Sequence, residues 1–243
     1  MSCGRSILII AHRGASAVAP ESTRVAICEA VRLRAQMVEL DVQMTLDGRL
    51  VVFHDDRLER TTNGTGMVTR KRYAELASLD AGSWFHRRFA GERILLLSQA
   101  IRLVPPPLGI NLELKHTSKP RTFLARFLRI IRRTRMRSRL LVSSFDPDLL
   151  RPLRSQQVAL ALICQRDPDR SLTRAIQFGC RAWHPAHEFA TPGRIARAHT
   201  AGLRVHAWTV ETHAQAWRLV RWGVDGMFTN HPGHLRGFIH DDL

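Results

Sequence analysis

The chain has 243 residues, 44% of them hydrophobic, which is enough to bury the core of one sizeable domain. Its 37 Lys and Arg residues outnumber its 21 Asp and Glu residues, so the formal net charge is +16 and the sequence pI is about 11.4. A field of this sign attracts phosphoesters, acidic lipid surfaces and nucleic acids alike, and the charge alone therefore selects none of them.

Targeting and cysteine patterns exclude several protein classes. No apolar stretch reaches the roughly 18 residues that a membrane-spanning helix needs, and the short N-terminal apolar run lacks a signal-peptide cleavage pattern. The four cysteines, Cys3, Cys28, Cys164 and Cys180, are scattered and form no Cys-x-x-Cys pair. We therefore expect a cytoplasmic protein with reduced thiols.

Nine short apolar runs bounded by turn residues are predicted to be strands, and amphipathic segments of helical length separate most of them. Alternating strands and helices are typical of a parallel sheet. The strand candidates are 7–11, 37–42, 50–53, 108–114, 140–143, 158–164, 181–184, 203–208 and 226–229. The helix candidates are 23–34, 98–103, 119–137, 147–155, 171–178, 192–201 and 211–222.

The third strand candidate, 50–53, explains why the count exceeds eight. The segment before it, 43–49, contains Asp47-Gly48 and is too short for a crossover helix, so 50–53 is expected to return antiparallel to 37–42. The other eight runs then form a TIM (β/α)8 barrel. The hairpin also brings His54 back beside Asp41.

Residues 56–93 interrupt the alternation of strands and helices. They contain the turn-rich segment 61–66 and one short helical stretch, 71–79. We interpret them as a small insertion after the second-strand hairpin, over one mouth of the barrel, within a single domain that spans 1–243. In such barrels the active site lies at the carboxyl ends of the strands.

Three carboxylates predict a metal site at those ends. Glu39 and Asp41 are two residues apart in a predicted barrel strand, so their side chains project to the same face. An exposed edge strand is the alternative interpretation, but two inward carboxylates repel unless a cation separates them. Glu113 is the natural third ligand. Oxygen ligands of this kind favour one Mg²⁺, Mn²⁺ or Ca²⁺ over zinc.

Two histidines and two cations complete a phosphate-handling set. His12 stands beside Arg13 and His54 beside Asp55, each after a strand-like run. One such histidine is more often structural, but two of them suit the acid and base needed to cleave a P–O bond. Arg13 and Lys115 are predicted to hold phosphate oxygens, with solvated surface charge as the alternative.

Trp208 and the segment 119–139 each have two possible interpretations. Trp208, which ends a strand candidate, is either barrel core or a pocket wall whose ring can hold a quaternary ammonium group. The arginine-rich segment 119–139 can bind an anionic membrane surface, but an outer barrel helix with solvated arginines explains it as well. We expect a weak membrane association at most. The single tyrosine gives no support to nucleic-acid binding.

From residue 10 nearly to residue 232 the chain resembles the glycerophosphodiester phosphodiesterase family of phospholipase-C-like TIM barrels. Each motif is weak alone, but their order and spacing are specific. The motifs are His12-Arg13-Gly14, Pro20-Glu21-Ser22-Thr23, Glu39-Leu40-Asp41, His54-Asp55, Glu113-Leu114-Lys115 and Trp208-Thr209-Val210. Asn230 departs from the family pattern, which usually has Asp there, and removes one charge near the mouth.

The resemblance implies metal-dependent hydrolysis of glycerophosphodiesters to sn-glycerol 3-phosphate and an alcohol. The implied metal ligands are Glu39, Asp41 and Glu113, the acid and base are His12 and His54, and the phosphate contacts are Arg13 and Lys115. The sequence leaves open the alcohol, the metal, the role of each histidine and the oligomeric state. The alternatives are phospholipase-D-like action on lysophospholipid or phospholipid at a membrane surface, and a non-catalytic anion-binding barrel.

Overall fold

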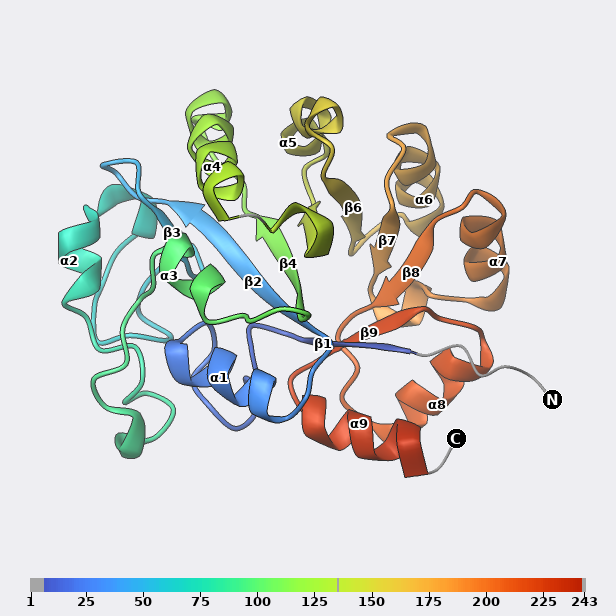
Figure 1. The fold of residues 1–243 in the computed structure, drawn as a ribbon, viewed down its shortest axis with the longest axis horizontal. Coiled ribbons are helices and arrows are strands. Elements are labelled where there is room, and N and C mark those ends of the chain that lie inside the picture. Colours follow the sequence, from blue (N-terminus) through green and yellow to red (C-terminus); the bar gives the residue numbers. More distant parts are fainter. Residues whose placement is uncertain (1–6, 135, 242–243) are drawn as a thin grey trace.

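Eight parallel strands close into a barrel in the computed structural model, and the helices lie around its outside (Figure 1). The structure describes residues 7–134 and 136–241. Each barrel strand pairs with the next, and the last pairs with the first, so the predicted TIM barrel is confirmed. The barrel strands are β1 (Leu8–Ala11), β2 (Met37–Met44), β4 (Gly109–Leu114), β5 (Leu140–Ser144), β6 (Ala159–Cys164), β7 (Ala182–Pro185), β8 (Arg204–Ala207) and β9 (Gly226–Thr229).

The short strand β3 (Leu50–Val52) lies outside the barrel and pairs antiparallel with β2. In this pairing Val42 faces Val52 and Met44 faces Leu50. Just beyond β3, the Phe53 N–H donates a 3.1 Å hydrogen bond to the Asp41 carbonyl. The predicted hairpin is therefore confirmed, and it delivers His54 to the carboxyl end of β2.

The period of two along β2 separates the barrel interior from the layer under the helices. Leu40 and Val42 belong to the large apolar core between strands and helices. Glu39 and Asp41 alternate with them and are also buried, so they face the interior of the barrel. A few small or apolar side chains, among them Leu141 and Ala161, form a separate cluster inside the barrel.

The outer helices follow the strands in order. They are α1 (Arg24–Arg32), α3 (Leu97–Arg102), α4 (Pro120–Thr134), α5 (Pro147–Leu150), α6 (Pro168–Gln177), α7 (Pro192–Thr200), α8 (His213–Arg221) and α9 (Pro232–Asp241). The predicted basic helix 119–139 is too long, because α4 ends at Thr134 and the short 3₁₀ turn η3 (Arg137–Arg139) follows. Among the described residues, no helix has both the length and the apolar character to cross a bilayer.

The segment between β3 and α3 contains little regular structure. Its elements are the 3₁₀ turn η1 (Val68–Arg70), the short helix α2 (Tyr73–Ala77) and the 3₁₀ turn η2 (Arg87–Phe89). Its buried side chains pack with those of β3 in a small apolar cluster of Val51, Phe53, Leu58, Val68, Leu76, Ala81 and Ile94. This cluster attaches the segment to the side of the barrel that carries His54.

Candidate active site

After β1 the chain turns so that the backbone N–H and the side chain of Arg13 both point into the site. Arg13 has a φ of +58°, and its N–H donates a 2.9 Å hydrogen bond to Glu39 Oε2. Gly14 follows with a φ of +84°, and a Cβ on it would lie 2.7 Å from the backbone of Ala26 in α1. Glycine is therefore required for α1 to approach the strand end this closely.

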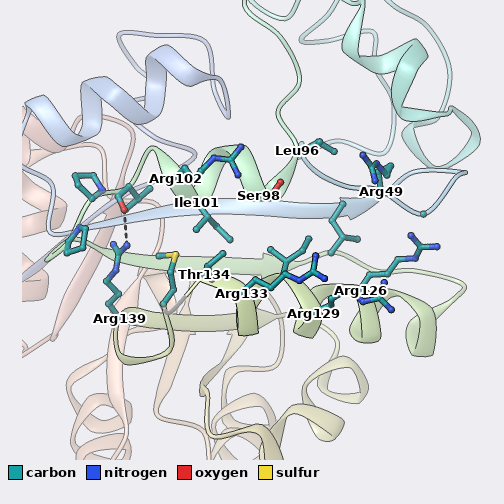
Figure 2. Close-up of a pocket in the computed structure, with 17 residues that line it drawn as sticks. Arg49, Leu96, Ser98, Ile101, Arg102, Arg126, Arg129, Arg133, Thr134 and Arg139 are labelled. Atoms are coloured by element: carbon teal, nitrogen blue, oxygen red, sulfur yellow. Dashed lines mark hydrogen bonds between the residues drawn. The ribbon is translucent and has the colours of Figure 1, made fainter.

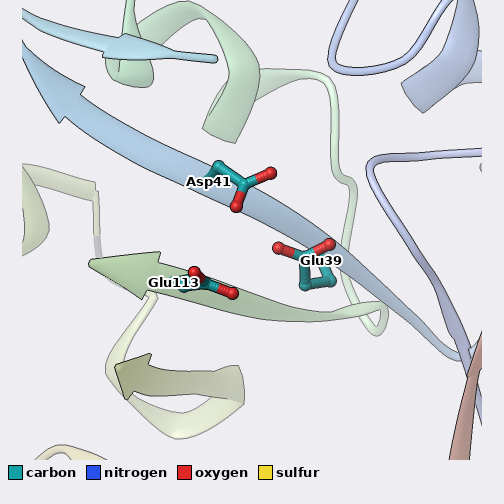
Figure 3. A group of neighbouring side chains, drawn as sticks. All are labelled: Glu39, Asp41 and Glu113. Atoms are coloured by element: carbon teal, nitrogen blue, oxygen red, sulfur yellow. The ribbon is translucent and has the colours of Figure 1, made fainter. Parts of the chain in front are cut away.

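Three carboxylates converge inside the barrel. Asp41 on β2 pairs in register with Glu113 on β4, and Glu39 lies one strand repeat earlier. One oxygen from each carboxylate lies within 4.8 Å of the other two, and Figure 3 shows the three groups facing one another from the adjacent strands. The predicted trio is therefore brought together, with Glu39 and Asp41 each at most 2% exposed.

The electrostatics of this cluster fit a cation. Burial, and then the charge of Asp41, raises the pKa of Glu39 well above its ordinary value and that of Glu113 to about 7. Burial alone would also raise the pKa of Asp41, but the Lys115 and Arg13 charges outweigh it and lower that pKa. Buried Glu39 Oε1 and Asp41 Oδ2 have no hydrogen-bond partner. Such orphaned oxygens are suited to bind a hard divalent ion.

Both predicted phosphate ligands lie at the edge of the carboxylate cluster. Lys115 Nζ is 3.1 Å from Glu113 Oε1 and 3.5 Å from Asp41 Oδ1. Arg13 Nε is 3.5 Å from Asp41 Oδ2, and Arg13 Nη1 is 2.9 Å from Glu21 Oε1. Glu21 therefore holds the guanidinium in place over the site.

The His12 side chain is held by a residue far away in the sequence. Its Nδ1 lies 2.8 Å from Asn230 Oδ1, and the same oxygen lies 2.7 Å from Ser16 Oγ. With the Asn230 amide in this orientation its oxygen only accepts, so the imidazole carries its proton on Nδ1 and leaves Nε2 available as an acceptor. Burial, and then the Arg13 charge, lowers the pKa of His12 to about 4.

His54 has a different environment because it pairs with a carboxylate. Its Nδ1 lies 2.5 Å from Asp55 Oδ1. Gln43 on β2 fixes this loop, since its Nε2 lies within 3.2 Å of the carbonyl oxygens of Phe53, His54 and Asp55. The Asp55 carboxylate thereby fixes the orientation of the imidazole, which lines the cavity described below.

Arg60 links His54 to the other side of the mouth. Its guanidinium donates to both oxygens of Asp55, at 2.6 and 2.9 Å, and to both oxygens of Glu21, at 2.7 and 2.8 Å. The segment after β3 and the loop after β1 are thereby joined across the site. Sequence reasoning missed this residue because the two carboxylates lie 5 and 39 positions away.

A cavity of about 440 Å³ opens at these strand ends. Trp208 forms part of its wall: its Nε1 donates a 2.8 Å hydrogen bond to the His184 carbonyl, and its ring meets that of Phe145 edge to face at 5.8 Å. The cavity is lined by His12, Arg13, Glu39, His54, Asn111, Glu113, Lys115, Phe145, Ile163, Gln165, His184, Trp208 and Phe228. All predicted site residues line it except Asp41, which is buried beside Arg13 and Lys115.

Asn111 and His184 are lining residues that sequence reasoning missed. Asn111 stands two residues before Glu113 on β4 and donates to Ser143 Oγ at 2.9 Å, which leaves its buried Oδ1 without a partner. The strand period of two, which places Asn111 on the same face as Glu113, could have identified it from the sequence. His184 Nε2 lies 3.1 Å from His206 Nδ1, and burial lowers the pKa of both imidazoles. Both are therefore neutral.

Comparison with known proteins gives concordant results across nearly the whole chain. Residues 12–234 match the sequence model of the glycerophosphoryl diester phosphodiesterase family. A glycerophosphodiester phosphodiesterase of Caldanaerobacter subterraneus subsp. tengcongensis is 33% identical over 236 residues, covering 96% of this chain and 97% of that protein. One from Bacillus subtilis is 30% identical over 249 residues, covering 93% and 84%.

Solved structures agree with the sequence comparisons. An Oleispira antarctica phosphodiesterase, determined in complex with the product sn-glycerol-3-phosphate, has a TM-score of 0.91 and 30% identity over 96% of each chain. A glycerophosphodiester phosphodiesterase from Agrobacterium tumefaciens has a TM-score of 0.82 and 28% identity, covering 95% of this chain and 99% of that one.

Proposed function

Because the chain belongs to the glycerophosphoryl diester phosphodiesterase family, we propose that it uses one divalent cation and two histidines to release sn-glycerol 3-phosphate and an alcohol from glycerophosphodiesters. The observation that carries this proposal is that the cluster of Glu39, Asp41 and Glu113 adjoins a cavity lined by His12 and His54. The product seen in the Oleispira antarctica structure is sn-glycerol-3-phosphate, which supports the same product here.

Glu39, Asp41 and Glu113 would hold the cation, which we propose is Mg²⁺, Mn²⁺ or Ca²⁺. Each contributes a carboxylate oxygen, and the unpartnered Oδ1 of Asn111 lies on the same strand face as Glu113. When bound, the ion supplies Lewis-acid stabilisation of the charge that develops on phosphoryl oxygens. Its charge also favours the ionised forms of Glu39 and Glu113.

The surroundings of the two histidines suggest different roles. His12 is neutral and offers Nε2, so we propose that it accepts the proton of the glycerol 2-hydroxyl as that oxygen attacks phosphorus. His54, paired with Asp55, would donate a proton to the alcohol oxygen as its bond to phosphorus breaks. Water then opens the cyclic phosphate, with the proton transfers reversed.

Arg13 and Lys115 would bind the free phosphoryl oxygens. Both lie beside the carboxylates and line the cavity, so a phosphate placed between them and the cation meets positive charge on several sides. Trp208 and Phe145 also line the cavity. The Trp208 ring would contact the departing alcohol, and a quaternary ammonium group such as choline would gain from its π face.

The proposed physiological setting is the cytoplasm. The described cysteines Cys28, Cys164 and Cys180 are free thiols, as expected in a reducing compartment. We propose a small-molecule substrate, with weak membrane association as a separate property of the basic surface.

A substrate and metal panel tests the proposal. Protein stripped with EDTA is incubated with glycerophosphocholine, glycerophosphoethanolamine or glycerophosphoglycerol, and glycerol 3-phosphate is measured after adding Mg²⁺, Mn²⁺ or Ca²⁺. We expect release only with a cation, and none from Glu113→Gln, whereas the exposed control Glu188→Gln stays active. Turnover of lysophospholipid vesicles alone, or release of phosphocholine in place of choline, would refute the proposal.

A further inference from the structure

A large groove lies on the outside of the barrel, away from the cavity just described. It has a volume of about 870 Å³ and runs between α3 and α4, from Arg49 in the β2–β3 turn to Arg139 (Figure 2). None of the residues lining it also lines the catalytic cavity. The groove is therefore a separate concave surface.

Arginines from separate parts of the chain converge on this groove. Arg126, Arg129 and Arg133 extend from α4, while Arg102 extends from α3 and Arg49 from the β2–β3 turn. All five are exposed. At one end of the groove, Arg139 donates to the carbonyl oxygens of Leu108 and Val104.

The positive charge of the groove is not compensated by nearby carboxylates. No Asp or Glu lines it, and within the described residues none of its arginines has a carboxylate within 4.0 Å. The Arg126 guanidinium lies close against the β2–β3 turn, since a Cβ added to Gly48 would lie 2.6 Å from its guanidinium carbon. Like charges that converge in a concavity repel one another, and a bound anion would relieve that repulsion.

The groove floor is apolar. Leu50, Ile101 and Val104 are at most 3% exposed beneath the arginines, and the partly buried Leu96 and Ile130 continue the surface. Guanidinium groups above an aliphatic floor match a ligand that has both a phosphate and a hydrocarbon part. A small hydrophilic anion would leave the partly exposed Leu96 and Ile130 without an apolar partner.

Nucleic acid fits the groove less well than lipid does. Its 17 lining residues include no Phe, Tyr or Trp, whereas unpaired bases stack on aromatic side chains. A solvated face of α4 does not account for the whole arginine cluster, because the charges come from α3 and the β2–β3 turn as well as from α4. We propose that this groove binds anionic phospholipid at a bilayer surface, with headgroup phosphates on the arginines and acyl chain against the floor.

A lipid-binding groove would place the protein at the membrane where its substrate is formed. Removing both acyl chains from a glycerophospholipid leaves a glycerophosphodiester, so a deacylation reaction at a membrane must supply this substrate. This consequence rests on the proposed function. The lipid site itself does not, because vesicle binding is measured without any turnover.

Two triple variants with the same charge change separate the groove from general electrostatics. The groove variant is Arg126→Gln, Arg129→Gln and Arg133→Gln. The control is Arg121→Gln, Arg132→Gln and Arg137→Gln, three arginines on α4 or just after it that do not line the groove. Circular dichroism and thermal unfolding establish that both variants are folded.

Binding is measured by co-sedimentation with vesicles of phosphatidylcholine with or without phosphatidylglycerol. We expect binding only with phosphatidylglycerol, an affinity loss of roughly tenfold or more for the groove variant, and a much smaller loss for the control. Arg102→Gln, on the other wall, should also weaken binding. Equal losses in both triple variants would overturn the proposal, as would wild-type affinity in the groove variant or equal binding to pure phosphatidylcholine. Duplex DNA that the groove binds in preference to vesicles would overturn it too.

Discussion

His12 Nδ1 and Asn230 Oδ1 lie 2.8 Å apart, although 218 positions separate them in the sequence. The contact joins the end of β1 to the end of β9, the two strands that close the barrel. Asn230 therefore orients the imidazole with a neutral amide oxygen and not with a carboxylate. Burial, and then the Arg13 charge, lower the pKa of His12, and the hydrogen bond to Asn230 opposes them.

Replacing Asn230 with Asp should raise the pKa of His12. A carboxylate at the same distance stabilises the imidazolium, whereas wild-type His12 has a pKa lowered to about 4. A general base loses activity as the pH falls through its pKa, so the acid limb of kcat/KM should move to higher pH in Asn230→Asp. Asn230→Ala, which removes the anchor without adding charge, should lower kcat but shift the limb little. An unchanged limb in Asn230→Asp would contradict the proposed role of His12.

Metal binding should depend on pH because protons and the cation compete for the same carboxylates. Burial and the charge of Asp41 raise the pKa of Glu113 to about 7, and only the ionised carboxylate binds the cation. Affinity should therefore rise with pH, by up to roughly tenfold per unit below pH 7, and flatten above it. Calorimetry in buffers of different ionisation enthalpy should detect proton release. A flat affinity between pH 5 and 7 would exclude Glu113 as a proton-linked ligand.

The bound cation should also stabilise the fold. At a concentration of 100 times its Kd a ligand adds about 2.7 kcal/mol, and the unfolding temperature of the wild type should rise accordingly. Glu113→Gln should show no such rise, while Glu188→Gln should behave as the wild type. Without metal, Glu113→Gln should be no less stable than the wild type, because it removes repulsion among three buried carboxylates.

The carboxylates and the hairpin could be predicted because each depends on short-range pattern. Glu39 and Asp41 share a face through the strand period of two, and Asp47-Gly48 in a short connection predicts a return. Glu113 follows from the same period on β4 once strands β2 and β4 are neighbours. These inferences need only strand geometry and the parallel barrel, and both were available from the alternation of apolar runs.

Contacts between distant segments could not be predicted in the same way. Arg60 bonds Glu21 across 39 positions, and Ser16 and Asn230 meet across 214. The helical stripe on α4 predicted one arginine-rich face, but Arg49 and Arg102 complete the groove from elements whose placement depends on the whole barrel. The same holds for His184 and His206, which meet inside the barrel from separate strands.

The Arg60 bridge should contribute to stability in a pH-dependent way. Hydrogen bonds from Arg60, and then from His54, lower the pKa of Asp55 far below its ordinary value, and Arg60 also lowers that of Glu21 against the effect of burial. Carboxylates with depressed pKa values stabilise the fold above their unfolded pKa, near 4, and this stabilisation is lost as the pH falls further. Arg60→Gln should therefore be less stable than the wild type at pH 7, by about 1 kcal/mol, and the difference should shrink towards about pH 2.

Urea unfolding at the two pH values measures this difference, and Arg57→Gln is the matched control because Arg57 pairs with Glu59 away from the site. Arg60→Gln should also lower kcat, since Asp55 loses the group that holds it against His54. A difference in stability that is equal at both pH values would show that the Asp55 and Glu21 charges are not its source.

Trp208 provides the most direct test of how the cavity chooses the departing alcohol. Its indole is fixed by the hydrogen bond to the His184 carbonyl and by the ring of Phe145, so the π face has a defined position in the cavity wall. A desolvated cation–π contact contributes on the order of 2 kcal/mol, which corresponds to roughly thirtyfold in affinity. Trp208→Ala should therefore raise KM for glycerophosphocholine far more than for glycerophosphoglycerol, which has no cation. Trp208→Phe should recover part of the difference, because phenylalanine retains a weaker π face.

Trp217→Ala, at an exposed tryptophan on α8, should change neither KM. Equal increases for both substrates in Trp208→Ala would mean that the indole only fills space, and the choline preference would then be rejected.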